Sequence, residues 1–121
     1  MRRADPIVHV ELHTSDLAEA RSLYTELLNW RPLRLRTRSG SYQALELDGG
    51  VSGGIVECPT ARALWLPYVA VDRVEHATAR AAELGATVLV EPREGPAGWR
   101  SVISTAAGGE IAFWQHKRVI A

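Results

Sequence analysis

Three side chains that can carry protons alternate near the start of the chain: His9, Glu11 and His13. Because successive side chains of a β-strand point to opposite faces, a strand over residues 7–13 places these three on one face and apolar side chains on the other. Histidine changes charge near neutral pH and a nearby carboxylate can accept its proton, so the pattern indicates general acid–base chemistry. His9 is the candidate acid or base and Glu11 its candidate helper. The alternative is a strand histidine that only hydrogen-bonds a neighbour.

A helix that ends at Asn29 is predicted to follow this strand. Ser15 or Asp16 can cap its start, and Glu19 stands three residues after Asp16, which is the spacing of a capping box. Asn29 can leave the helix in a left-handed conformation. The predicted buried stripe of the helix consists of Leu17, Ala20, Leu23, Tyr24, Leu27 and Leu28.

The strand and helix return 56 residues later, which makes the chain a repeat. Pairing Asp16 with Asp72 also pairs Leu28 with Leu84 without a gap, and Gly85 suits the exit of the second helix. The residues expected to line that helix are Val74, Ala77, Thr78, Ala81 and Leu84.

Three more strands are predicted after each helix, so each unit has the order β-α-β-β-β. Segment 92–98 holds two prolines and two glycines and is expected to be the most irregular stretch. The predicted strands are 30–37, 42–48 and 51–58 in the first unit, and 64–72, 86–91, 99–105 and 110–116 in the second.

Size and charge narrow the class of protein. A chain of 121 residues with 46% hydrophobic residues can bury the core of one domain. Its 14 basic and 14 acidic side chains balance, which argues against nucleic acid or an anionic membrane as a partner. The longest apolar run, 63–71, is too short to span a bilayer. We therefore expect a soluble, cytoplasmic protein. Cys58 is the only cysteine, which excludes an internal disulfide and a thiolate zinc cluster.

Six motifs are spread over nearly the whole chain: H-V-E-L-x-x-S-D-L from His9, S-L-Y-x-E-L-L from Ser22, G-G-I from Gly53, W-x-P-Y-V-x-V-D from Trp65, A-A-E-L-G-A from Ala81 and G-G-E-I-A-F-W from Gly108. Together they resemble the vicinal oxygen chelate superfamily, which includes glyoxalase I, methylmalonyl-CoA epimerase, extradiol dioxygenases and the bleomycin resistance proteins. The resemblance implies an α+β fold in which two tandem βαβββ modules, 6–59 and 63–117, form a cleft of curved mixed sheets within one domain, 1–121. It also implies a homodimer.

The resemblance also carries an expectation about metal. Metal-dependent members place one ligand on the first strand and one on the last strand of each unit. His9 matches the first position, and Glu57 is the counterpart on the last strand of the first unit. The equivalent positions of the second unit are Leu66 and Ala112, whose side chains have no lone pair to donate. We therefore expect no cofactor, or at most a weak divalent-metal site of His9 and Glu57 that Glu110 could complete.

Aromatic side chains gather in the second unit, where the metal positions are apolar. Rings on the faces of Leu66 and Ala112 would make a surface suited to a flat organic molecule, although core packing is the alternative, above all for Trp65. The candidate ligand-binding residues are Tyr42, Leu66, Tyr68, Trp99, Ala112 and Trp114.

Arg34, Arg36 and Arg38 alternate along one predicted strand. They fit a charged edge strand that resists aggregation, or a site that binds a carboxylate or phosphate.

Three hypotheses about function follow. In the first, a metal-independent isomerase, lyase or cyclase-type enzyme binds a small aromatic or polyketide-like molecule in the cleft between the modules. His9 then moves a proton with help from Glu57 or Glu11, and a tyrosine hydroxyl steadies an oxygen. In the second, the protein sequesters a drug or metabolite without catalysis, as the bleomycin resistance proteins do. In the third, His9 and Glu57 hold a divalent metal for a lyase or dioxygenase reaction.

Overall fold

The structure is a computed structural model that describes residues 3–37, 40–47, 49–95 and 97–117, with the side chains of these ranges except those of 35–37 and 40–42. The chain divides into two compact units. The N-terminal unit is Val8–Leu66, and the C-terminal unit consists of the described parts of Met1–Ile7 and Pro67–Ala121.

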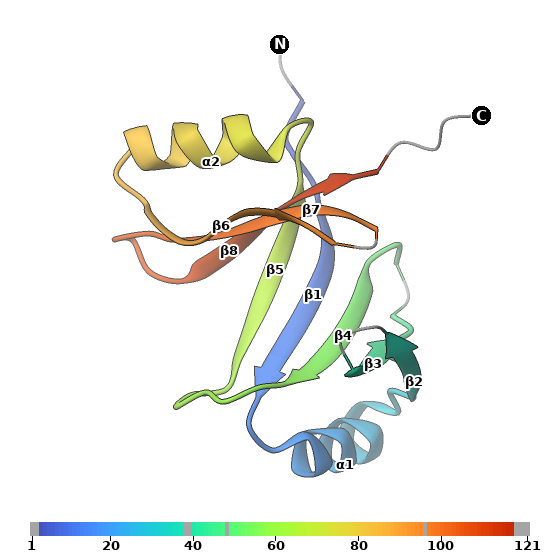
Figure 1. Cartoon of the computed structure of the whole chain (residues 1–121). Helices are drawn as coiled ribbons and strands as arrows, with labels where there is room; N and C mark the ends of the chain where they lie inside the picture. Colours follow the sequence, from blue (N-terminus) through green and yellow to red (C-terminus); the bar gives the residue numbers. More distant parts are fainter. Residues whose placement is uncertain (1–2, 38–39, 48, 96, 118–121) are drawn as a thin grey trace, which may run out of the picture. The chain divides into compact units, whose positions relative to one another are not determined.

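The N-terminal unit is built from β1 (Ile7–Thr14), α1 (Leu17–Leu28), β2 (Pro32–Thr37), β3 (Gly40–Leu45) and β4 (Ser52–Glu57). Its strands lie in the order β2-β3-β4-β1, with β1 and β4 parallel and the other pairs antiparallel. Figure 1 shows α1 in blue beside β2, β3 and β4. The parallel pair joins the first and last strands of the unit, so residues far apart in sequence become neighbours.

The C-terminal unit repeats this order with β5 (Leu64–Ala70), α2 (Val74–Glu83), β6 (Thr87–Glu94), β7 (Gly98–Ser104) and β8 (Glu110–His116). Its strands lie in the order β5-β8-β7-β6, and β5 and β8 are the parallel pair. Helix α2 packs against β6, β7 and β8 (Figure 1). The predicted α+β fold of two βαβββ modules is therefore confirmed.

The two helices begin in different ways. In α1 the Asp16 side chain accepts a hydrogen bond from the backbone N–H of Glu19 at 3.0 Å, as the sequence predicts for a cap. The residue before α2, Arg73, makes no such bond; instead Gln115 Oε1 accepts from the N–H of Val74 at 2.8 Å. Both helices end as predicted, at residues with positive φ: 55° at Asn29 and 100° at Gly85.

The core of the N-terminal unit lies between α1 and the sheet. Leu12, Leu45 and Ile55 are at most 4% exposed, and side chains from α1 pack on them. Three rings close one end: Tyr24 stacks on Trp30 with centroids 5.3 Å apart, and Trp65 meets both edge-on. Trp65 is therefore a core residue of this unit, which was one of the two readings that its sequence position allowed.

Three predictions about local structure differ from the structure. The expected buried stripe of α1 is too wide, because Leu23, Leu27 and Leu28 are 52%, 66% and 44% exposed. Leu84 is also exposed, at 71%. Segment 92–98 is mostly strand, since β6 continues through Pro92 to Glu94 and β7 begins at Gly98. Proline is tolerated here because β6 ends the strand order of its unit and its register with β7 shifts before Arg93.

Within the ranges given above, no helix has the length and apolarity needed to cross a membrane.

Candidate active site

A histidine–glutamate cluster lies on β1 and β4 of the N-terminal unit and consists of His9, Glu11, His13 and Ser52. The Glu11 carboxylate lies between the two imidazoles: Oε1 is 2.8 Å from His13 Nε2, and Oε2 is 3.4 Å from His9 Nε2. The second ring nitrogen of His9, Nδ1, is 2.6 Å from the Ser52 hydroxyl. Glu11 is 9% exposed, whereas the His9 and His13 side chains are 21% and 25% exposed. A buried carboxylate therefore supports two imidazoles that solvent can reach.

The pairing of β1 with β4 explains why these residues meet. His9 is opposite Ser52 and Glu11 is opposite Gly54, so the cluster occupies one face of the parallel pair. Leu12, on the other face, is opposite Ile55 and belongs to the core under α1. The alternation that predicted a polar and an apolar face of the first strand is confirmed.

Glu57 does not join the cluster. It is opposite Thr14, one position out of step with His9, Glu11 and His13, so it lies on the other face of the sheet. Its Oε2 accepts a hydrogen bond from the backbone N–H of Leu17 at 3.2 Å. The expectation that Glu57 orients His9, or binds a metal with it, is therefore wrong, and Glu57 acts at the first turn of α1.

The face of the C-terminal sheet that is opposite to α2 carries most of the predicted ligand-binding residues. Alternation along β5 places Leu66 and Tyr68 on one face, and the pairs Tyr68–Ala112 and Ala70–Trp114 place Ala112 and Trp114 on the same face. Leu66, Tyr68 and Ala112 are 1%, 5% and 0% exposed. The Tyr68 and Trp114 rings meet edge to face with centroids 6.4 Å apart.

Arg100 adds charge to this face. It is opposite Trp114 in the β7–β8 ladder, and its Nη1 donates a hydrogen bond to the Tyr68 hydroxyl at 3.1 Å. We name Tyr68, Arg93, Arg100 and Trp114 the arginine–aromatic face, because Arg93 of β6 is the partner of Arg100 in the adjacent ladder.

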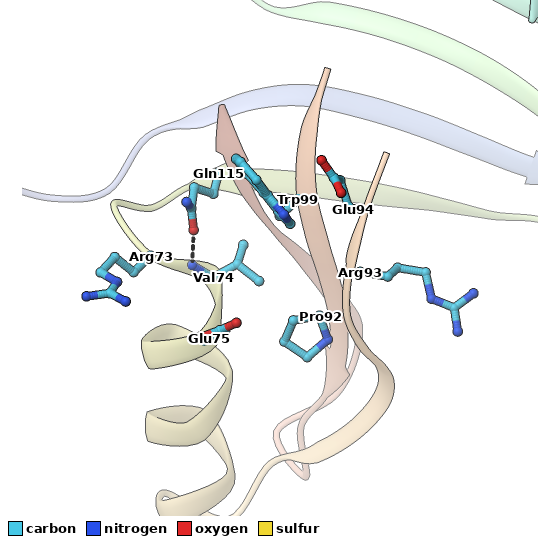
Figure 2. A pocket seen from close by; sticks show the side chains of 8 residues that line it. All are labelled: Arg73, Val74, Glu75, Pro92, Arg93, Glu94, Trp99 and Gln115. Carbon is cyan, nitrogen blue, oxygen red and sulfur yellow. Dashed lines mark hydrogen bonds between the residues drawn. The ribbon is translucent and has the colours of Figure 1, made fainter. Parts of the chain in front are cut away.

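Trp99 lies on the other side of this sheet. It is opposite Gln115, whose side chain binds the start of α2, so Trp99 and Trp114 point to opposite faces. The prediction that both rings line one site is wrong for this reason. Trp99 instead lines a pocket of about 440 Å³ beside the start of α2 (Figure 2). Lys117 Nζ lies 5.6 Å from the Trp99 ring centre and 2.8 Å from a Glu94 carboxylate oxygen.

The remaining candidates are placed only in part. Tyr42 is opposite Leu35 in the β2–β3 ladder, but its side chain lies outside the described set. The same holds for the Arg36 side chain and for the whole of Arg38, whereas Arg34 is exposed. Glu110 begins β8 opposite Ser104, and alternation along β8 places it on the same face of the sheet as Ala112.

The expected metal ligands do not fit a divalent metal. His9 and Glu57 are on opposite faces of the sheet, and Leu66 and Ala112 offer only carbon. In the described ranges no three His, Cys, Asp or Glu side chains are grouped as metal ligands. Glu11 is instead hydrogen-bonded to both imidazoles.

Two site residues were missed from the sequence. Ser52 joins His9 only through the β1–β4 pairing, which spans 43 residues and has no local signature. Arg100 did have a signal, since alternation within 98–104 places it on the face opposite to Trp99.

Comparison with known proteins follows this geometry. A family model described as a glyoxalase-like domain matches residues 8–114. Among curated proteins, CFP32 of Mycobacterium bovis and Mycobacterium tuberculosis, which carries the name of a glyoxylase, is 28% identical over 121 residues. The match covers 92% of this chain but 46% of that protein, so the chain spans about half the length of the curated relatives.

Solved structures agree on the fold. A hypothetical protein from Bacillus halodurans has a TM-score of 0.71 at 14% identity, with 98% of this chain and 99% of that one covered. Methylmalonyl-CoA epimerase from Mycobacterium tuberculosis has a TM-score of 0.64 at 15% identity, with 98% and 94% covered. At these identities the likeness shows a shared fold and leaves the reaction to be argued from the site.

Proposed function

Because the chain belongs to the family of glyoxalase-like domains, we propose that it binds a small organic molecule and that His9 moves a proton on that molecule. The observation that carries this proposal is the Glu11 carboxylate, nearly buried and hydrogen-bonded to both His9 and His13. Such a partner supports a general base, because the carboxylate stabilises the imidazolium that forms when the base takes a proton.

The hydrogen bonds allow His9 a starting state that suits this role. The Ser52 hydroxyl has one proton, which can go to the Val8 carbonyl oxygen at 3.4 Å or to His9 Nδ1 at 2.6 Å. With the His9 proton on Nε2 directed at Glu11, Nδ1 is a lone-pair acceptor for that hydroxyl. A substrate C–H or O–H that replaces this hydroxyl can pass its proton to Nδ1. In an isomerase-type step the proton then returns to another atom of the same substrate. In a lyase-type step the bond to a leaving group breaks as the new double bond forms, and the proton goes from His9 to that leaving group. Neither step consumes acid or base.

No step of this proposal passes through a metal, because the residues at the expected ligand positions do not fit one. The cytoplasmic location, the homodimer and the cleft between modules that the resemblance implies stay predictions.

Exchange of substrate hydrogen with solvent tests the proposal. Methylmalonyl-CoA, phenylpyruvate and 4-hydroxyphenylpyruvate each have an acidic C–H beside a carbonyl, and deuterium uptake from D2O by each is measured by mass spectrometry against the rate without protein. The protein should accelerate exchange in at least one, and His9→Ala should remove roughly a hundredfold or more of that acceleration. His76→Ala, an exposed histidine of α2, is the matched control. Absence of acceleration in all three compounds, or full activity of His9→Ala, would refute the proposal.

A second candidate, sequestration without catalysis, is favoured by a different observation. Trp114 is half-buried and offers ring surface beside the buried, apolar Ala112 and the edge of the buried Tyr68 ring. Tight binding of an aromatic compound with no exchange of its hydrogens would favour this candidate.

A further inference from the structure

We infer that the C-terminal unit binds the oxyanion of a planar organic acid on its arginine–aromatic face, with Arg93 and Arg100 as the cationic partners and Trp114 as the ring surface. The inference concerns the C-terminal unit alone and goes beyond the proposed function, which concerns His9 of the N-terminal unit. Binding itself is measurable without turnover.

The first support is the unused hydrogen-bonding capacity of Arg100. A guanidinium has five N–H donors, and Arg100 gives one nitrogen to the Tyr68 hydroxyl. Across the residues with described side chains, no carboxylate lies within ion-pair distance of Arg100 or Arg93. Two other cations of the unit are paired: Arg80 with Glu83 at 3.0 Å and Lys117 with Glu94 at 2.8 Å.

The second support is the placement of two like charges opposite each other. Arg93 and Arg100 are direct partners in the β6–β7 ladder, so their side chains leave the same face of the sheet. Figure 2 shows the Arg93 side chain directed away from Trp99 and Glu75, as this register requires. Like charges at directly opposed positions destabilise a sheet, and an anion between them turns the repulsion into two attractions.

The third support is the ring beside the guanidinium. Trp114 is the β8 partner of Arg100, and its ring lies against Gly98, where an added Cβ would be 2.9 Å from Trp114 Cζ2. An added Cβ would also collide with the Gln115 carbonyl oxygen, so glycine at position 98 leaves room for both the ring and the strand backbone. Guanidinium groups beside an aromatic surface match a flat molecule that carries a carboxylate or phosphate.

Protection of an edge strand explains only part of this pattern. Arg93 is exposed on β6, which ends the strand order of its unit, so it could deter pairing with other chains. Arg100 is on the inner strand β7, half-buried, and hydrogen-bonded to a tyrosine that is 5% exposed. Edge protection therefore does not explain Arg100. Its bond to Tyr68 satisfies a buried hydroxyl and uses one nitrogen, and we assign the other donors to a ligand.

Calorimetric titration with three small probes tests the inference. 4-Hydroxybenzoate carries a carboxylate, phenyl phosphate carries a phosphate, and 4-hydroxybenzamide is the neutral isostere of the first. At least one anion should bind ten or more times tighter than the amide, and the ratio of the two anions identifies which oxyanion the site prefers. Equal affinity for all three probes, or binding of none, would overturn the inference.

Variants of the two arginines test whether these residues cause the preference for the anion. Arg100→Gln and Arg93→Gln should each lower anion affinity at least tenfold and leave amide affinity unchanged. Arg93 is exposed and has no protein partner in the described part of the chain, so its variant should keep the wild-type melting temperature even if Arg100→Gln unfolds. Arg80→Gln is the matched control on the same unit. An equal loss in that control would overturn the assignment.

His9→Ala separates this inference from the proposed function, since it should abolish hydrogen exchange but keep the preference for the anion. Anion binding without exchange in the wild-type protein would sustain the inference and refute the proposed function. Hydrogen exchange in the carbonyl acids, with equal affinity for the anions and the amide, would sustain the proposed function and refute the inference.

Discussion

The carboxylate of Glu57 accepts a hydrogen bond from the backbone N–H of Leu17, and the two atoms are 3.2 Å apart. A carboxylate at this place satisfies one of the free N–H groups of the first turn of α1 and complements the helix dipole. Sequence resemblance had given the same side chain to a metal or to His9. In the structure, Glu57 therefore stabilises the start of α1 and takes no part in the histidine–glutamate cluster.

Glu57→Gln should accordingly lower the free energy of unfolding by about 0.5–1 kcal/mol, because it removes the charge and weakens the bond at the helix start. Urea denaturation followed by circular dichroism measures this. Hydrogen exchange of the carbonyl acids should stay within twofold of wild type. A hundredfold loss of exchange would return Glu57 to the active site.

Glu11→Gln, in contrast to Glu57→Gln, should lower the rate of substrate hydrogen exchange. A carboxamide can accept a hydrogen bond from only one of the two imidazoles, and it cannot stabilise an imidazolium by charge. We expect exchange to fall at least about tenfold, with an altered pH profile, because Glu11 positions and supports His9. The measurement is the rate of deuterium uptake across pH 5 to 9, with Glu57→Gln as the matched control. An unchanged pH profile would contradict a role for Glu11 beyond structure.

The two tryptophans on opposite faces of β7 and β8 provide a direct comparison. Trp114→Ala should weaken binding of the preferred aromatic anion at least tenfold, about 1.4 kcal/mol, because it removes the ring surface beside Arg100. Trp99→Ala should leave that affinity unchanged, since the Trp99 ring is on the α2 side. Titration calorimetry measures both. Equal losses in the two variants would show that the effect is one of general stability.

The buried hydroxyls of Thr78 and Ser101 connect α2 to its sheet, and the hydrogen bonds define which hydroxyl donates to which acceptor. Thr78 Oγ1 donates to the Val74 carbonyl at 2.6 Å, so Ser101 must donate in the 2.7 Å contact between the two hydroxyls. Thr78→Val leaves the Ser101 donor buried without an acceptor and should cost about 1–3 kcal/mol. Ser101→Ala should cost about 1 kcal/mol, because the Thr78 donor keeps its acceptor. Chemical denaturation gives both values, and the reverse order would contradict the assignment of donors.

Added metal should have no effect on stability. A divalent ion at 100 times its dissociation constant would raise the free energy of unfolding by about 2.7 kcal/mol, which shifts the melting temperature by several degrees. Zinc, nickel, manganese and iron(II), each added to chelator-treated protein, should leave the melting temperature within one degree. A rise of several degrees with one of them would show that a metal site exists after all.

Local signals predicted most of the fold. The cap at Asp16 and the helix exits at Asn29 and Gly85 depend on residues within one turn of each other, and all three match. The order of strands and helices followed from the same kind of signal. The width of the buried stripe of α1 was not predicted correctly. The α1 side chains that pack against the core are those of Leu17, Ala20 and Tyr24.

Register limited the prediction of the site. Side chains alternate with a period of two, so an error of one residue moves a side chain to the other face of a sheet. Placing Glu57 beside His9 was such an error across the β1–β4 pair, and placing Trp99 beside Trp114 was such an error across β7–β8. Residues within one strand, such as His9, Glu11 and His13, needed no register and were grouped correctly.

The different caps of the two helices bear on the order of folding. The cap of α1 joins Asp16 to Glu19, so its first turn can form as soon as that segment leaves the random coil. The first turn of α2 gains its side-chain acceptor from Gln115, which is 41 residues further along the chain and is positioned when β8 pairs with its neighbours. Because loop closure over that distance costs entropy, we expect the start of α2 to be capped later in folding than the start of α1.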